Sequence, residues 1–223
     1  MSVLHELAPA KVNLCLFLGP TRADGRHELV SVMQSIGLSD SLSMRDSAGQ
    51  VDEVRCAGVA GPNLAAAALA AYRAATGWDG PAQLLEIEKR IPVAAGLGGG
   101  SADAAAALRL IARRAGRAED EALLVELAGT LGADVAGQVR PGRVLATGAG
   151  ERVQRMAEPQ PFGLLVLASR AQLSTPAVYA QADAMDLGHD APWLARQDDG
   201  APQRILDGKG HVSCRAGDAL RAA

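Results

Sequence analysis

A run of small residues at positions 92–102, PVAAGLGGGSA, has the composition and spacing to hold a phosphate group. Its glycines let the backbone adopt positive φ and approach a ligand closely. Backbone N–H groups then converge with the N-terminus of the following helix, whose partial positive charge favours an anion. Ser101 adds a hydroxyl that can bind phosphate or a metal ion. The alternative is a flexible turn. The predicted loop comprises Pro92, Val93, Ala94, Ala95, Gly96, Leu97, Gly98, Gly99, Gly100, Ser101 and Ala102.

Two common nucleotide-binding motifs are excluded at this loop. A Walker A loop ends in Gly-Lys-Ser/Thr, and no lysine follows these glycines. A dinucleotide fingerprint requires G-x-G-x-x-G, and counting from Gly96 the last position is Ser101. The phosphate-binding prediction therefore depends on the glycines and on the helix behind them.

The loop lies between a predicted strand and a predicted helix, and further strands are expected elsewhere in the chain. Residues 12–18 and 83–91 alternate in polarity, which indicates strands, and residues 29–44 indicate a further extended region. Residues 45–62 are polar and rich in glycine, which favours a hairpin and loop, and residues 142–147 and 163–169 are also predicted strands. In the first strand we expect one face to carry Val12, Leu14, Leu16 and Leu18, and the other Asn13, Cys15 and Phe17.

Three helices are indicated by capping residues and apolar spacing. Asn63 can cap a helix that ends at Gly77. Ser101 or Asp103 is expected to begin a second helix, which ends near Gly116. A third spans about residues 119–131. From about residue 186 the sequence has little apolar periodicity, and we expect a poorly structured tail.

Composition narrows the class of protein. The chain has 223 residues, 48% hydrophobic and 21% charged, as in globular proteins. The net charge of −3 lacks the basic excess of a non-specific nucleic-acid binder, so an anionic ligand must be held by local groups. Three cysteines at no metal spacing disfavour a disulfide framework and predict a reducing, cytoplasmic location. We see no signal peptide or membrane span. Arginine outnumbers lysine 19 to 3, which draws attention to each lysine.

Several blocks, in order over about residues 5–185, resemble the GHMP small-molecule kinases and, among them, the family of 4-diphosphocytidyl-2-C-methylerythritol kinase. The glycine loop alone marks the superfamily, whereas the opening block and the DGRHEL block point to the family. The resembling blocks outside the loop are APAKVNL at 8–14, DGRHEL at 24–29, GADV at 132–135, ATGAGE at 146–151 and LSTPAVY at 173–179.

The resemblance implies an α+β GHMP kinase fold. Residues 1–155 would form an N-terminal ATP-binding domain of the ribosomal protein S5 domain 2-like type, and residues 156–223 an incomplete α+β C-terminal domain. The implied reaction transfers the ATP γ-phosphoryl group to the 2-hydroxyl of 4-diphosphocytidyl-2-C-methyl-D-erythritol, in the non-mevalonate route to isoprenoids. Magnesium would accompany ATP without a resident metal site. The partner would be a small molecule, with no nucleic acid or membrane, and the oligomeric state is not indicated.

The resemblance also assigns roles in catalysis. Asp134 would be the catalytic base, which orients the attacking hydroxyl and accepts its proton; otherwise it forms a turn or cap. Lys11 would keep that carboxylate charged and stabilise the transferring phosphate oxygens; otherwise it reaches solvent from a strand edge. Asn13, on the same strand face as Lys11, would bond the substrate or this pair, or make a structural bond.

A second group of residues would bind the cytidine. His27 would read the cytosine edge, and Tyr179 would stack on the base unless it packs in the core. Thr175 would bond nearby. Asn63 would contact the adenine side or serve only as a helix cap. Arg26 replaces a usual tyrosine, and its guanidinium plane can still stack on a base.

Other departures from the family pattern affect the loop and the end of the chain. Ala102 replaces a second serine, and Ala136 replaces a proline. The Asn-Asp-Leu segment and the late Ser-Gly-Ser/Thr-Gly loop of the family are absent, so the chain is expected to be truncated, with marginal folding or aggregation. The alternatives to an active kinase are a weak or inactive nucleotide-binding remnant, or a GHMP kinase for homoserine, mevalonate or a sugar. The DGRHE and STPAVY segments argue against the last.

Overall fold

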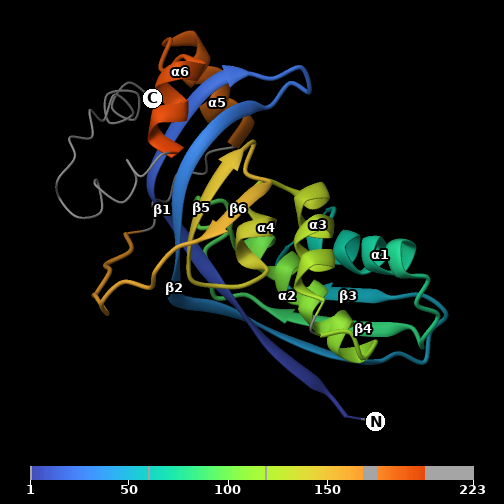
Figure 1. Ribbon diagram of the computed structural model, residues 1–223. Coiled ribbons are helices and arrows are strands. Elements are labelled where there is room, and N and C mark those ends of the chain that lie inside the picture. Colours follow the sequence, from blue (N-terminus) through green and yellow to red (C-terminus); the bar gives the residue numbers. More distant parts are fainter. Residues whose placement is uncertain (1, 60, 119, 168–174, 199–223) are drawn as a thin grey trace.

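A long antiparallel hairpin organises the structure, a computed structural model that describes residues 2–59, 61–118, 120–167 and 175–198 (Figure 1). Its strands are β1 (Leu4–Thr21) and β2 (His27–Asp46). The edge of β2 away from β1 pairs with two further strands, one beside each half of β2. The remaining strands are β3 (Glu53–Cys56), β4 (Gln83–Glu88), β5 (Arg143–Gly148) and β6 (Arg152–Arg155), and the sheet order is β3-β4-β2-β5-β6.

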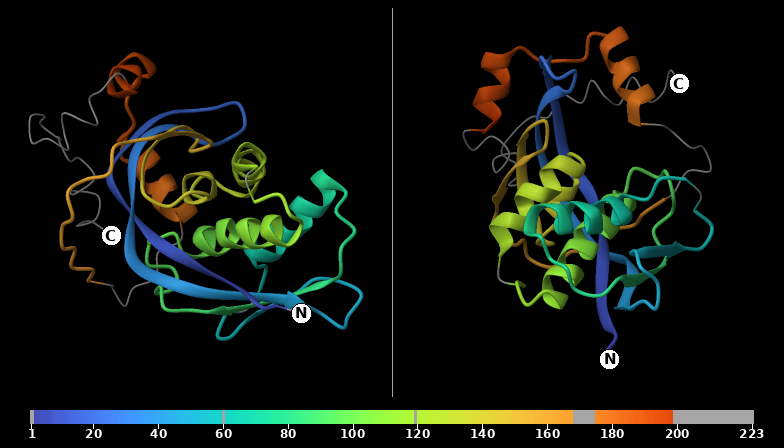
Figure 2. Two further views of the ribbon diagram at one scale, coloured as in Figure 1. Left: turned by 60° about the horizontal axis from the view of Figure 1, so that its bottom comes forward. Right: turned by 90° about the vertical axis from the view of Figure 1, so that its right-hand side faces the viewer.

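Helices fill the concave side of this curved sheet (Figure 2). They are α1 (Leu64–Thr76), α2 (Gly99–Arg114), α3 (Glu121–Leu131) and the short α4 (Val135–Gln138). The alanines of α2 are fully buried, because small side chains let this helix approach the sheet and α1 closely. Two further helices, α5 (Thr175–Ala184) and α6 (Ala191–Asp198), lie near the tip of the β1–β2 hairpin.

The predicted helices and their caps are largely confirmed. The Asn63 side chain accepts a hydrogen bond of 2.8 Å from the N–H of Ala65, and Gly77 ends α1 in the left-handed region. The second helix begins earlier than predicted, at Gly99, because Gly98 adopts φ +67° and starts it without a side-chain cap. Asp103 does not cap this helix; its carboxylate is paired with Lys89.

The first strand has the predicted alternation, but the prediction of its faces needs correction. Cys15 and Phe17 are buried, whereas Leu16 is 43% exposed. The register of the β1–β2 pairing shifts between Asn13 and Cys15, and α6 covers the face that carries Cys15. Leu194 of α6 is among the apolar residues packed there.

Three other predictions for loops and strands are wrong. Residues 45–62 form no hairpin, because α1 carries the chain across and β3 pairs parallel with β4. Residues 163–167 form no strand and are exposed apart from the half-buried Val166, and residues 168–169 fall outside the described residues. The predicted tail contains α6 in its described part. Nowhere in the described chain is a helix both long enough and apolar enough to cross a membrane.

Candidate active site

A cavity of about 880 Å³ opens between the glycine loop, the middle of the hairpin, and Val178 and Tyr179 of α5. Pro92 to Ser101 line it, together with Lys11, Asn13, Asp134 and Tyr179. Ala102 is 1% exposed and packs in the core, so of the predicted loop residues it alone does not line the cavity. Segments far apart in the sequence therefore meet at one hollow.

The glycine loop presents an open helix end to this cavity. Gly96 and Gly98 adopt φ values of +74° and +67°, which glycine reaches without strain. The first intrahelical bond of α2 runs from Ala102 N–H to the Gly98 carbonyl, and no side chain caps the helix. The N–H groups of Gly99–Ser101 precede that bond, so they can donate to an anion.

The backbone of β1 holds the loop in place. The N–H of Lys11 donates to the carbonyl of Leu97 at 2.9 Å, and the side-chain amide of Gln138 donates to the carbonyl of Gly98 at 3.0 Å. A Cβ on Gly98 would lie 2.9 Å from both Lys11 Cγ and Gln138 Nε2. The loop, β1 and α4 are therefore packed too closely for any side chain at this position.

Lys11 and Asp134 form an ion pair at the edge of the cavity. The distance between Lys11 Nζ and Asp134 Oδ2 is 3.0 Å, and Nζ also donates to Asn13 Oδ1 at 2.6 Å. Asn13 Nδ2 in turn donates to Ser31 Oγ, which donates to the carbonyl of Cys15. The ammonium group is thus held on one side by the Asp134 carboxylate. On the other side it is held by Asn13, which belongs to a chain of hydrogen bonds across the hairpin.

The Asp134 carboxylate is accessible to a ligand although it is paired with Lys11. Asp134 precedes α4, but its side chain makes no capping bond to that helix. Its carboxylate is about one-third exposed, whereas the Lys11 side chain is nearly buried. A charged oxygen beside a buried ammonium group can accept a proton from a hydroxyl and orient it.

Tyr179, which lines the cavity, forms an aromatic pair with His27, which lies behind it and does not line the cavity itself. The rings of His27 and Tyr179 are 5.4 Å apart at 38°, and His27 Nε2 lies 3.3 Å from the Asp183 carboxylate. His27 Nδ1 lies 3.2 Å from the carbonyl of Gly19. Burial, and to a smaller extent the negative charge of Asp134, raises the pKa of Tyr179. The phenol therefore stays neutral at physiological pH and offers a flat ring close to the ion pair.

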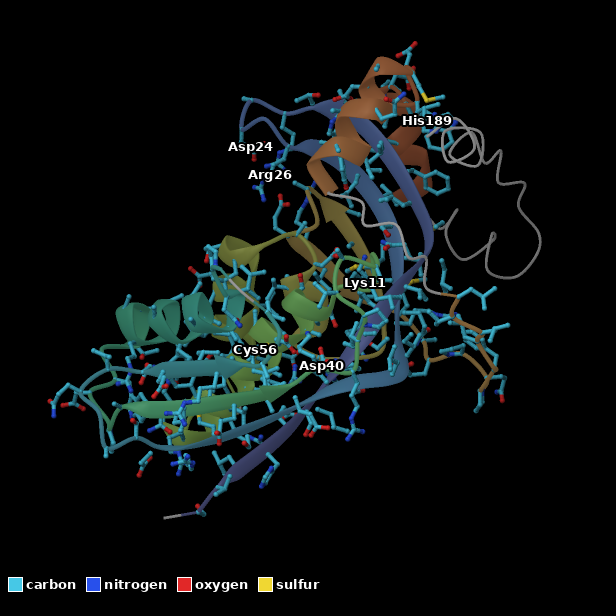
Figure 3. The ribbon with its side chains drawn as sticks, turned by 180° about the vertical axis from the view of Figure 1, so that it is seen from behind. Lys11, Asp24, Arg26, Asp40, Cys56 and His189 are labelled. Carbon is cyan, nitrogen blue, oxygen red and sulfur yellow. The ribbon has the colours of Figure 1, made fainter. Side chains whose placement is uncertain are left out.

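Neither Arg26 nor His27 is among the residues that line the cavity. Arg26 lies at the tip of the hairpin with Asp24, apart from Lys11 (Figure 3), and its guanidinium is bonded to the Asp24 carboxylate. The side chain of Thr175 lies outside the described residues, although the residue begins α5. Asn63 lines the cavity while it caps α1.

Sequence reasoning missed a second charged group beside the loop. Lys89 and Asp103 line the cavity, and the Lys89 ammonium bonds to both Asp103 and the buried Asp40. The scarcity of lysine in this chain is the signal that points to Lys89. Cys56 also lines this part of the cavity, close to Asp40 (Figure 3).

Comparison with known proteins shows the class to which this fold and site belong. Residues 63–146 match the family described as GHMP kinases N terminal domain. The structure also resembles mevalonate pyrophosphate decarboxylase from Streptococcus pyogenes, with a TM-score of 0.67 over 93% of this chain and 68% of that one, at 12% identity. That likeness is one of fold alone. The matched part of the chain is therefore a GHMP kinase-type N-terminal domain.

Relatives of higher identity narrow the class to one family. A crystal structure of 4-(cytidine 5'-diphospho)-2C-methyl-D-erythritol kinase is 34% identical, with a TM-score of 0.64, over 91% of this chain and 78% of that chain. The chain belongs to the family of 4-diphosphocytidyl-2-C-methyl-D-erythritol kinase.

Bacterial kinases of that name are also similar in sequence. The kinase of Anaeromyxobacter sp. (strain K) is 48% identical over 170 residues, 74% of this chain and 53% of that protein. The kinase of Leifsonia xyli subsp. xyli is 37% identical over 195 residues, 82% of this chain and 62% of that protein. The chain thus spans between about half and two-thirds of the length of these relatives.

Proposed function

We propose that this chain is an ATP-dependent kinase that phosphorylates the 2-hydroxyl of 4-diphosphocytidyl-2-C-methyl-D-erythritol, a step of the non-mevalonate route to isoprenoids. The observation that carries the proposal is the Lys11–Asp134 ion pair, 3.0 Å long, in one cavity with an uncapped helix N-terminus. Phosphoryl transfer needs these parts: a cradle for phosphate, a cation, and a base beside the attacking hydroxyl.

The donor in this proposal is ATP with Mg²⁺. The open N–H groups of Gly99–Ser101 suit the phosphates, and about 880 Å³ is room enough for a nucleotide. No group of three or more His, Cys, Asp or Glu in the described residues could hold a metal ion. Magnesium fits here as a partner of the phosphates, with the Ser101 hydroxyl as a protein ligand, since this ion is often bound mainly through substrate phosphates.

The chain's own residues would then act as follows. Asp134 orients the 2-hydroxyl and accepts its proton as that oxygen attacks the γ-phosphorus. The bond from the γ-phosphorus to the bridging oxygen breaks, and ADP leaves with the electron pair of that bond. Lys11 stabilises the charge on the transferring oxygens, and Asn13 holds the ammonium in position through its 2.6 Å hydrogen bond.

The acceptor would be recognised through its cytosine. His27 would hydrogen-bond the base edge once a ring nitrogen exchanged its present partner, the Gly19 carbonyl or the Asp183 carboxylate, for the base. Tyr179 would stack on the face of the base, a contact worth roughly 1–3 kcal/mol. Arg26 would stack on the cytosine only if its side chain left the Asp24 carboxylate. Thr175 remains a predicted contact.

We propose residues 1–155 as the ATP-binding domain and residues 156–223 as a C-terminal domain. We also propose a cytoplasmic location from the cysteine content.

The test is phosphoryl transfer by the purified 223-residue chain, supplied with ATP, magnesium and one acceptor at a time. We expect turnover with 4-diphosphocytidyl-2-C-methyl-D-erythritol and none with homoserine, mevalonate or galactose. Tyr179→Leu should raise the KM for the cytidine acceptor about 10-fold and leave the KM for ATP unchanged. Nucleotide binding without transfer to any acceptor would contradict the proposed activity and identify a nucleotide-binding remnant.

Gly98→Ala is expected to weaken nucleotide binding about 10-fold or more. The alanine would have to adopt a positive φ, and its methyl group would collide with Lys11. Calorimetric titration with a non-hydrolysable ATP analogue measures the effect. Gly100→Ala is the matched comparison, since its Cβ would meet only Leu64 Cδ1 at 3.9 Å. A smaller loss is expected there, and equal losses for the two variants would contradict this account of the loop.

A further inference from the structure

A buried ion network of three residues lies beside the glycine loop and has no role in the chemistry proposed above. Asp40 belongs to β2, Lys89 follows β4, and Asp103 lies in α2. The Lys89 ammonium lies 2.5 Å from Asp40 Oδ2 and 2.7 Å from Asp103 Oδ2. Asp40 is 0% exposed and Asp103 is 4% exposed. We call these residues the Asp40–Lys89–Asp103 network.

The network holds the chain on the N-terminal side of the glycine loop. Asp40 Oδ1 accepts the backbone N–H groups of Arg90 at 2.5 Å and Ile91 at 2.8 Å. These residues immediately precede Pro92, where the loop begins. One carboxylate therefore fixes both the Lys89 side chain and the backbone that enters the loop.

The same network holds the C-terminal side of the loop. Asp103 lies in the second turn of α2, and its bond to Lys89 ties this helix to the strand before the loop. Lys89 Nζ also packs under the first helical residue, since it lies 3.2 Å from the position of a Cβ on Gly99. The loop between these points is thus closed by a polar bridge that is independent of its own backbone bonds.

Burying such a bridge costs more desolvation free energy than filling the same space with apolar side chains. Two buried carboxylates share one ammonium group whose side chain is 14% exposed, and Asp103 Oδ1 is buried without a hydrogen-bond partner. Apolar side chains of similar volume are often at least as stable at buried positions of this kind. What the ions supply beyond packing is directional bonding, which fixes the distance and angle between strand and helix.

We propose that the Asp40–Lys89–Asp103 network positions the glycine loop for nucleotide binding by holding its two ends in the ligand-ready geometry. This inference rests on the proposed function only in that the loop binds a nucleotide. A loop already in its bound geometry loses less conformational entropy when the ligand arrives, so affinity rises. Lys89, Asp40 and Asp103 are positioning residues, which act through the N–H groups of Gly99–Ser101.

Asp103→Ala and Asp103→Asn, in the full chain, test the network. The alanine removes the bridge, whereas the asparagine oxygen can still accept from Lys89. Calorimetric titration with a non-hydrolysable ATP analogue, well below the unfolding temperature, should show about a 10-fold weaker Kd for Asp103→Ala and about a 3-fold change at most for Asp103→Asn. Lys89→Met replaces Asp103→Ala as the bridge-breaking variant if the alanine protein does not fold. Arg90→Met is the matched control, because that side chain is bonded to exposed Glu88.

The outcomes separate positioning from stability. A lower unfolding temperature with an unchanged Kd in Asp103→Ala would overturn the proposal, as would equal losses of affinity in the asparagine and alanine variants. Equal losses in Arg90→Met and Asp103→Ala would overturn it too. Wild-type protein that binds the analogue but transfers nothing to the cytidine acceptor would contradict the proposed substrate alone, since the network is judged by Kd. Wild-type protein that binds no nucleotide would overturn both.

Discussion

Asp134→Asn is expected to lower the rate of phosphoryl transfer by about 10³-fold, with little change in nucleotide affinity. Asparagine is close to aspartate in size, and its amide oxygen can still accept from Lys11 Nζ at the 3.0 Å position. The geometry of the pair is then kept, while the capacity to accept the hydroxyl proton is lost. Steady-state kinetics should therefore show the loss in kcat, with KM for ATP nearly unchanged.

Asp24→Asn is the matched control for this variant. Asp24 is 38% exposed and Asp134 35% exposed by side chain, and both carboxylates are paired with a cation, but Asp24 lies at the hairpin tip. The control should change kcat by less than about 3-fold, as expected for a surface ion pair. A comparable fall in both variants would mean that the loss reflects general disturbance, and full activity of Asp134→Asn would exclude its role as base.

The second large effect is expected for Lys11→Met, which should reduce kcat/KM by about 10²-fold or more. Methionine fills the space of the lysine stem that packs against Gly98, but it carries no charge. Asp134 and Asn13 both lose their donor, and the transferring oxygens lose a stabilising cation. Thermal unfolding and analogue titration of the same sample show whether the fold and the nucleotide site survive.

Combining the two substitutions distinguishes a cooperating pair from two independent residues. If Lys11 and Asp134 act together, the double variant should be little worse than the poorer single variant, since residues that act as a unit show strongly non-additive losses. Losses that multiply would show independent contributions. Lys11→Arg is not expected to restore activity, because the stem is in close contact with Gly98 and a guanidinium needs more room.

Local signals in the sequence predict much of the fold and the loop. Asn63 and Gly77 mark the ends of α1, because capping and positive φ are properties of a few neighbouring residues. The glycine loop was likewise recognisable from a short run. The proximity of Lys11 to Asp134 was expected from the family resemblance, and the structure brings these two residues together.

Long-range packing set the features that the sequence did not reveal. The buried face of β1 depends on a register shift and on α6, and neither leaves a mark on the alternation of residues 12–18. The parallel pairing of β3 depends on where α1 returns the chain. The Asp40–Lys89–Asp103 network joins a strand, a strand end and a helix, so no spacing within one segment signals it.

The hairpin also determines the order in which the site can assemble. Lys11, Asn13 and Ser31 lie within two strands joined by a short turn, so their hydrogen bonds close a short loop of chain and can form early. Asp134 comes from far along the chain, beyond α1, α2 and α3 in the sequence. Contacts of such sequence separation form late in folding because their loop-closure entropy is larger. The pair proposed for catalysis is therefore expected to form at the end of folding, so that recovery of phosphoryl transfer on refolding would report the completed domain and not the hairpin.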